Sequence, residues 1–266
     1  MKTLKFNQNF LGACHCAFTV IIALFLRETY TLYGSSKLAY LWTLLRDLFA
    51  VGAVIFIRLV LGVRFEKGLH IVLFVLCGFF IFHIVTETIT KCMTAIQANT
   101  SILSFPHVIP LDVMISRTLL VFFTNVQASL VVLILSFFYG IRFNITDYSL
   151  FIYCIVIAVL FGFSAGILMS ALAVFYPIIE KIWPIVKRIL FWTSGVFFTV
   201  ERFPPSIAKP MSHNPILQII EALRKSISHG IELSPILNPY YINFIVLSCL
   251  SFGLLFQKIS RERLNS

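Results

Sequence analysis

The sequence predicts an all-α integral membrane protein that crosses the bilayer six times. Of its 266 residues, 59% are hydrophobic and only 12% are charged, about half of the ~25% typical of soluble domains. Such a chain cannot present a polar surface to water on all sides. The apolar residues also form runs of about 20, the length that crosses the hydrocarbon core as a helix.

The net charge of +10 raises the question of a nucleic-acid partner, which we reject. A nucleic-acid-binding domain gathers its basic residues on one face. Here they lie in the gaps between apolar runs, as in loops that face the cytosol. Placing both termini inside puts more Lys and Arg residues in the inner segments than in the outer ones. We therefore expect both termini in the cytosol.

The N-terminal segment, residues 1–37, is expected to be cytosolic or interfacial. It contains Phe10–Leu26, which has no formal charge. A signal peptide is disfavoured because Arg27 and Glu28 follow where a small-residue cleavage site would stand. A true span is marginal at this length, and an interfacial helix would confine its apolar residues to one face, which this run does not. The relation of this helix to the membrane stays open.

A charged and aromatic hinge joins this segment to the first span. The apolar run ends on charged residues, a short polar stretch follows, and aromatic residues open the next helix as interface anchors do. The residues expected at this joint are Arg27, Glu28, Tyr33, Gly34, Tyr40 and Trp42.

The transmembrane domain is expected over residues 38–266, with spans at 38–63, 69–90, 115–139, 148–176, 182–200 and 240–257. The first span is unusual because it contains Arg46, Asp47 and Arg58. A charge at the bilayer centre costs ~2.5–3.5 kcal/mol on insertion scales, so such residues face protein or water. These three are candidates for a translocation path.

The longest irregular segment expected in the cytosol is residues 97–117. Pro106 and Pro110 bracket a break in it, and Ser101–Phe105 has room for one or two helical turns before that break. Asp112 follows in the first turn of the next helix, where a negative charge suits the helix dipole.

The fourth span carries two overlapping patterns. Residues 162–166, GFSAG, match the G-x-S-x-G motif of hydrolases, which needs a strand–turn–helix elbow and a later acid and His. Ala158, Gly162, Gly166 and Ser170 also recur at every fourth residue, which is typical of a face for close helix packing. Since the motif lies within an uncharged run that reads as helix, we favour packing over catalysis.

The segment after the fifth span is long and rich in proline. Asn214 and Pro215 are expected to begin a helix there, as its N-cap and first residue. The apolar residues that follow form one face, with Glu221, Arg224 and Lys225 opposite. Such a helix lies in the outer interface or dips into the membrane and returns, and the residues alone leave both alternatives open.

The sequence indicates no metal, cofactor or ATP site. Cys14, His15 and Cys16 lack the second ligand pair of a zinc site, and neither H-E-x-x-H nor a phosphate loop occurs. A membrane-embedded lipid or glycan enzyme is an alternative function. The polar residues of the outer segment show no acid–base spacing that would favour it.

Four segments resemble those of a known family. They are Phe25–Trp42, Ile96–Asp112, Ser194–Pro205 and Asn214–Gly230. The first resembles the N-terminal motif of type-2 ABC exporter permeases, the second their cytosolic segment between spans two and three, and the last two their outer re-entrant region. The chain is similar in particular to the permeases that export capsular polysaccharide in Gram-negative bacteria.

The resemblance implies a permease subunit of the bacterial inner membrane that exports a lipid-linked capsular polysaccharide without chemistry of its own. It implies a homodimer joined to two ATP-binding subunits, which bind ATP and magnesium. A periplasmic adaptor and an outer-membrane channel would receive the glycan. Export of O-antigen, teichoic acid or a drug on the same scaffold is the alternative.

The resemblance also assigns roles to residues. It makes Phe10–Leu26 an interfacial helix. It implies a coupling helix that docks on the ATP-binding subunit and contains Ser101, Ile102, Leu103, Ser104, Phe105, Pro106, His107 and Pro110. It implies an outer re-entrant region over residues 201–230, whose helices shape the outer exit. The residues that it assigns to this exit are Phe198, Glu201, Pro204, Asn214, Pro215, Glu221 and Arg224.

Overall fold

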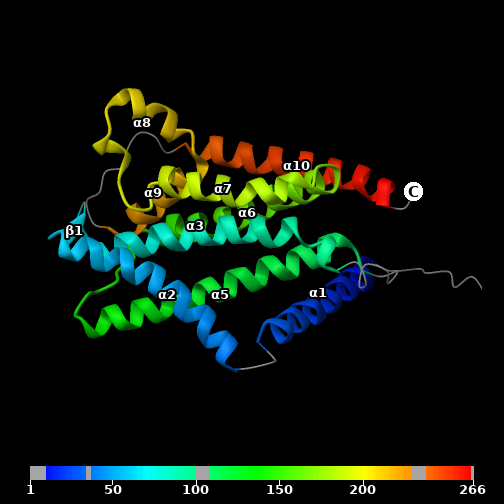
Figure 1. The fold of residues 1–266 in the computed structure, drawn as a ribbon, viewed down its shortest axis with the longest axis horizontal. Helices are drawn as coiled ribbons and strands as arrows, with labels where there is room; N and C mark the ends of the chain where they lie inside the picture. Colours follow the sequence, from blue (N-terminus) through cyan, green and yellow to red (C-terminus); the bar gives the residue numbers. More distant parts are fainter. Residues whose placement is uncertain (1–9, 34–36, 67, 100–107, 229–237, 265–266) are drawn as a thin grey trace, which may run out of the picture.

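The computed structural model describes residues 10–33, 37–66, 68–99, 108–228 and 238–264, which form helices and one short hairpin (Figure 1). The longer helices are α1 (Phe10–Tyr33), α2 (Lys37–Val60), α3 (Ile71–Met93), α5 (Pro110–Phe138), α6 (Tyr148–Phe175), α7 (Ile178–Thr193) and α10 (Pro239–Leu264). The shorter elements are β1 (Phe65–Glu66), β2 (Leu69–His70), η1 (Gln97–Asn99), η2 (Val200–Arg202), α8 (Pro205–Ser212) and α9 (Pro215–Ile227).

Helix α3 is the centre of the fold. It packs most extensively on α6 and α5 and also contacts α9, α2 and α7. Most of its side chains are buried, Phe74 and Phe82 among the largest. The β1–β2 hairpin, α8 and α9 lie at one end of the bundle, which we name the hairpin end (Figure 1). The turn between α6 and α7 lies at the opposite end.

The small-residue face of α6 is a packing surface, as predicted. A Cβ on Gly162 would meet the α3 backbone at Val85 at 3.1 Å. A Cβ on Gly166 would come within 2.7 Å of Cβ of Cys92. Glycine at these two positions therefore allows α6 to approach α3 closely.

The hydrolase-like motif has no catalytic geometry. Ser164 is buried within α6, and its hydroxyl donates to the carbonyl of Phe161 at 3.1 Å. The serine thus lies inside a continuous helix, whereas the hydrolase motif requires a strand–turn–helix elbow. Packing, not catalysis, explains these residues.

Four helices in the described part of the chain are long and apolar enough to cross a membrane. They are α3, α5, α6 and the Pro239–Ile259 part of α10. In α2, Leu48–Val60 is a shorter apolar stretch. Helix α7 has 16 residues, or about 24 Å at 1.5 Å per residue. A helical membrane fold is thus confirmed, whereas the count of six spans stays a prediction.

Several helix boundaries differ from the bounds of the predicted spans, and two of them have a clear local cause. Helix α5 begins at Pro110, which confirms that Asp112 stands in its first turn and puts the helix start ahead of the span predicted at 115–139. Pro suits the first helical position, and Asp112 Oδ2 accepts the Ile109 N–H at 3.0 Å. Helix α7 ends at Thr193, ahead of the predicted end at residue 200. Gly195 follows with φ of +67°, a left-handed conformation that ends helices.

Helix α9 begins as predicted and then departs from the prediction. Asn214 Oδ1 accepts the Ile216 N–H at 3.0 Å, and Pro215 takes the first helical position, which confirms the N-cap. The helix is buried against α6 and α3. Arg224, predicted on a polar face, is only 3% exposed. That prediction was wrong because backbone carbonyls of neighbouring segments accept its N–H groups, as described below.

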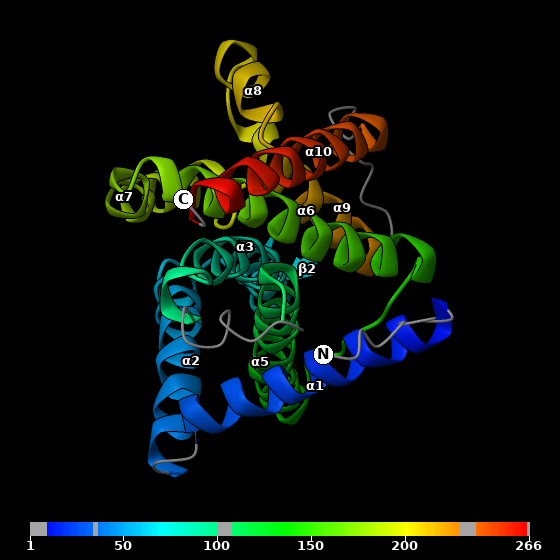
Figure 2. The same ribbon diagram turned by 90° about the vertical axis from the view of Figure 1, so that its right-hand side faces the viewer.

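Helix α1 lies across the bundle. Figure 2 shows α3 and α5 strongly foreshortened, while α1 runs along its length across the view. One side of α1 packs on α5, with Leu24 buried. On the other side Phe18, Ile22, Leu26 and Tyr30, each four residues after the last, are exposed. The helix therefore presents apolar side chains on two faces.

Candidate functional site

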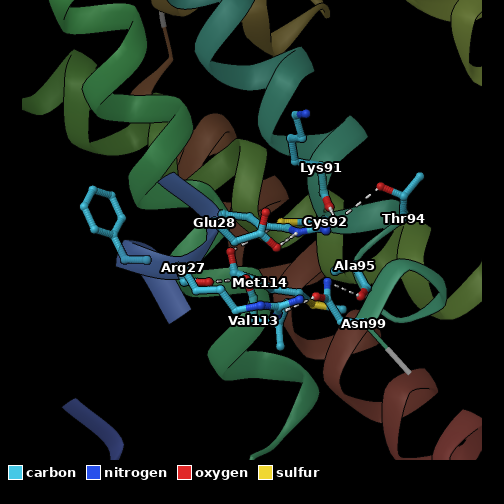
Figure 3. Close-up of polar contacts among 12 residues, drawn as sticks. Arg27, Glu28, Lys91, Cys92, Thr94, Ala95, Asn99, Val113 and Met114 are labelled. Atoms are coloured by element: carbon cyan, nitrogen blue, oxygen red, sulfur yellow. Dashed lines mark hydrogen bonds and ion pairs between the residues drawn. The ribbon is translucent and has the colours of Figure 1, made fainter. Parts of the chain in front are cut away.

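A largely buried polar cluster joins α1, α3 and α5 (Figure 3). It lies at the last turn of α3, whereas the β1–β2 hairpin precedes the first turn of that helix. At the centre of the cluster, Arg117 Nε donates to Glu28 Oε1 at 3.1 Å. Its Nη1 donates to the carbonyl of Lys91 at 2.9 Å and to Thr94 Oγ1 at 3.4 Å. The side chains of Arg117 and Glu28 are 10% and 14% exposed. We name Glu28, Lys91, Thr94 and Arg117 the Arg117 cluster.

The charges of the Arg117 cluster compensate one another. The carbonyl of Lys91 belongs to the last turn of α3, where carbonyls lack intrahelical partners and the helix dipole favours a cation. Arg117 satisfies this carbonyl, and Glu28 supplies the countercharge that a guanidinium needs away from water. A charge-assisted hydrogen bond therefore fixes α1 to the ends of two other helices.

A second contact extends this junction to η1. Arg27 Nη1 donates to Asn99 Oδ1 at 3.3 Å, and Asn99 Nδ2 donates to the carbonyl of Ala95 at 3.1 Å. Asn99 is buried. Arg27 and Glu28, which are neighbours on α1, thus have different partners, Asn99 and Arg117; Figure 3 labels Arg27, Glu28 and Asn99.

The junction borders the segment predicted to couple to an ATP-binding subunit. The predicted residues Ser101, Ile102, Leu103, Ser104, Phe105, Pro106 and His107 lie outside the described residues. Asn99 precedes this segment and is held by α1. Pro110 follows it and begins α5 beside the Asp112 cap. The residues on both sides of the segment therefore belong to the ends of helices. Arg117 connects these helices to α1.

A second buried arginine joins the elements at the hairpin end. Arg224 of α9 donates to the carbonyl of Phe74 on α3 at 3.1 Å. It also donates to the carbonyls of Gly195, Val196 and Phe198 at 2.8, 2.9 and 3.4 Å. Its guanidinium lies 3.5 Å from the centre of the Phe74 ring, a cation–π contact. Arg224 therefore ties α9 to α3 and to the turn after α7.

Two other residues predicted in the outer region serve the same junction. Glu221 Oε1 accepts the Val200 N–H at 3.2 Å, and Asn214 Nδ2 donates to Ser194 Oγ at 3.0 Å. Glu201 instead lies exposed in η2. The predicted residues that belong to this turn, to the start of α8 or to α9 are Phe198, Pro204, Asn214, Pro215, Glu221 and Arg224.

Arg46 and Arg58, two of the residues predicted for a translocation path, do not share one face of α2. Arg46 is exposed and Arg58 is half-buried. They stand 12 residues apart in sequence, which turns a helix by about 120° beyond whole turns. Gly34 and the side chains of Tyr33, Tyr40, Trp42 and Asp47 lie outside the described residues.

Arg117 and Asn99, which complete the junction, were not predicted from the sequence. One signal pointed to Arg117, because a charge at the start of an apolar run requires a partner. That partner, Glu28, stands 89 residues earlier, and a single sequence does not reveal such a pair.

Among the described residues, no group of three or more His, Cys, Asp or Glu side chains is placed to hold a metal. The arrangement is suited to joining helices mechanically.

Residues 19–227 match the family model described as ABC-2 type transporter. The match begins within α1 and ends at the last residue of α9, so it includes both arginine junctions and well over half of the chain. The chain belongs to the ABC-2 type transporter family. As an ABC-2 type protein, it is a membrane subunit, in agreement with its apolar helices.

The chain is similar to named exporters over most of its length. It is 25% identical to the polysialic acid transport protein KpsM of Escherichia coli over 249 residues, 90% of this chain and 93% of KpsM. It is 25% identical to the capsule polysaccharide export inner-membrane protein CtrC of Neisseria meningitidis serogroup A over 254 residues, 96% and 95% of the two chains. It is 22% identical to the O-antigen export system permease protein RfbA of Klebsiella pneumoniae over 256 residues, 94% of each.

Proposed function

We propose that this ABC-2 type chain is the permease subunit of a bacterial inner-membrane exporter of lipid-linked capsular polysaccharide. It works as a homodimer with two separate subunits that bind and hydrolyse ATP. The names of KpsM and CtrC support the substrate class, and the order of the four family-like segments supports the architecture. A periplasmic adaptor and an outer-membrane channel receive the glycan.

The observation that carries this proposal is the junction around Arg117. A permease without an ATP site must receive motion from a partner at its cytosolic surface. At this junction α1, α3 and α5 converge on the two flanks of residues 100–107. A force on that segment therefore acts on three helices at once.

In this proposal the Arg117 end faces the cytosol and the hairpin end faces the periplasm. Both termini are cytosolic, six helices cross the membrane, and α1 lies in the inner interface. The region from η2 to α9 re-enters the membrane from the periplasmic side and shapes the outer exit.

Deletion of the gene tests the function. We expect glycan to accumulate inside the cell while its synthesis continues. Loss of synthesis would contradict export and favour an enzyme. Loss of O-antigen in place of capsule would identify the second candidate substrate, which the likeness to RfbA supports.

Replacement of residues 101–107 by a Gly/Ser loop of equal length tests the coupling role. We expect the ATP-binding subunit to dissociate during purification while membrane insertion is retained. The control is the same replacement in residues 230–236, between α9 and α10, which should leave the complex intact. Unchanged co-purification after the 101–107 replacement would refute the coupling assignment.

A further inference from the structure

Two cavities adjoin at the hairpin end. One lies between α3, α5, α6 and α9, and the other lies between the β1–β2 hairpin, the loop from α5 to α6 and the end of α9. The first has a volume of about 290 Å³ and an almost wholly apolar lining, which includes Leu76, Phe80, Leu130 and Leu133. The second has a volume of about 450 Å³ and a mixed lining, which includes His70, Tyr139, Arg142 and Asn144. Ile227 lines both, so the two cavities are neighbours at the end of α9.

The loop between α5 and α6 separates polar from apolar side chains along this pair of cavities. Arg142 and Asn144 line the mixed cavity, whereas Phe143 and Ile145 line the apolar one. We name the two cavities together the composite site. Because polar and apolar side chains alternate along this loop, the composite site is amphipathic. One part suits a hydrocarbon chain and the adjoining part suits a polar group attached to it.

The apolar cavity exists because α5 and α6 diverge. Each packs extensively on α3, but they contact each other far less. The space between them is lined by α3 residues such as Leu76 and Phe80, and Leu130 is half-exposed on its α5 side. In a membrane-inserted chain this opening meets acyl chains. A cavity with such a lining does not hold water and accepts apolar ligands.

The mixed cavity favours an anion. The described residues that line it include Arg142, which is exposed, and no acidic side chain. His70 Nδ1 accepts the Val72 N–H at 3.3 Å, so the neutral ring carries its proton on Nε2 as a further donor. Arginine is well suited to phosphate. Tyr139 is a side chain typical of the headgroup level.

We propose that this composite site binds a membrane phospholipid, with one acyl chain in the apolar cavity and the phosphate beside Arg142. Soluble phosphate would leave the apolar cavity empty, and a neutral lipid would leave Arg142 without a countercharge. A phospholipid of the leaflet on the hairpin side satisfies both parts.

Native mass spectrometry of the purified full-length chain tests this site with phosphatidylglycerol, with diacylglycerol of the same chains and with glycerol phosphate. We expect phosphatidylglycerol to bind best. Arg142→Gln should weaken its binding roughly tenfold, the effect of one lost charge-assisted hydrogen bond, and leave diacylglycerol binding unchanged. Leu130→Trp, which fills the apolar cavity, should weaken both lipids. Lys209→Gln, an exposed lysine on α8, is the matched control and should change neither.

Equal binding of diacylglycerol and phosphatidylglycerol would overturn the proposal, as would an Arg142→Gln variant that binds phosphatidylglycerol normally. Displacement of phosphatidylglycerol by a lower concentration of a lipid-linked glycan would also overturn the assignment to a resident membrane lipid. A thermal unfolding curve for each variant distinguishes loss of the site from loss of the fold. If Leu130→Trp does not fold, Arg142→Gln alone decides the outcome.

Discussion

The guanidinium of Arg117 on α5 lies 3.1 Å from the carboxylate of Glu28 on α1, although 89 residues separate them in the chain. The same guanidinium satisfies a carbonyl at the end of α3. One side chain thus joins three helices, and it holds α1, which lies across the bundle in Figure 2, against α5 and the end of α3.

A double-mutant cycle on Glu28→Gln and Arg117→Gln measures this relationship. Each single change should lower the free energy of unfolding by about 1–3 kcal/mol, because hydrogen bonds to charged groups are worth that much. The double change should cost less than the sum, with a coupling of roughly 1 kcal/mol or more. The measurement is unfolding of the purified chain in detergent. Strictly additive losses would show that the ion pair contributes nothing.

Arg224→Met should destabilise the protein strongly. The change leaves up to four buried carbonyls without their donor, so we expect a loss of roughly 3 kcal/mol or more. The matched control is Lys225→Met on the next, half-exposed residue of α9, which should change stability by ~0.5 kcal/mol. Equal effects of the two changes in thermal unfolding would contradict the assignment of Arg224 to the hairpin-end junction.

Gly166→Ala should separate α6 from α3. The added Cβ would lie 2.7 Å from Cβ of Cys92, and overpacking of this kind costs about 1–3 kcal/mol. Gly52→Ala on α2 is the control because a Cβ there meets no atom within 4 Å. That change should raise helix stability by ~0.5–1 kcal/mol. The prediction fails if both variants unfold at the same temperature as the wild type.

Asp147 should make the stability of α6 depend on acid pH. The Leu150 N–H and the Ser149 hydroxyl donate to this carboxylate and hold its pKa below the usual value. Its capping contribution is therefore present above the ordinary pKa of ~3.9 and is lost as pH falls through the lowered pKa of the folded state. Asp147→Asn keeps a capping oxygen that does not titrate.

The measurement for Asp147 is the unfolding temperature between about pH 6 and pH 3. The wild type should lose more stability over this range than Asp147→Asn does, because only the wild type exchanges a proton at this cap. Parallel profiles for the two proteins would exclude the cap as the cause.

Much of the fold follows from patterns within single segments. The apolar runs predict the helices, the four-residue spacing of small residues predicts the face of α6, and Asn214 with Pro215 predicts the start of α9. Each of these signals is local, since it depends on helix periodicity or on the chemistry of one helix end.

The arginine junctions could not be predicted in the same way. A helical pattern places Arg224 on a polar face, yet carbonyls of α3 and of the turn after α7 receive its N–H groups. Every residue has a backbone carbonyl, so the sequence does not reveal which carbonyls accept the N–H groups of Arg224. The partners of Arg27 and Arg117 lie tens of residues away, so their pairing depends on the tertiary fold alone.

The distance in sequence between Glu28 and Arg117 also sets an order of events during synthesis. Glu28 leaves the ribosome 89 residues before its partner, which is roughly 4–18 s at ~5–20 residues per second. For that interval α1 has no anchor on α5, and an apolar helix in water would aggregate. With α1 in the inner interface, as proposed, the exposed row from Phe18 to Tyr30 would rest on the bilayer surface and hold the nascent helix until α5 arrives.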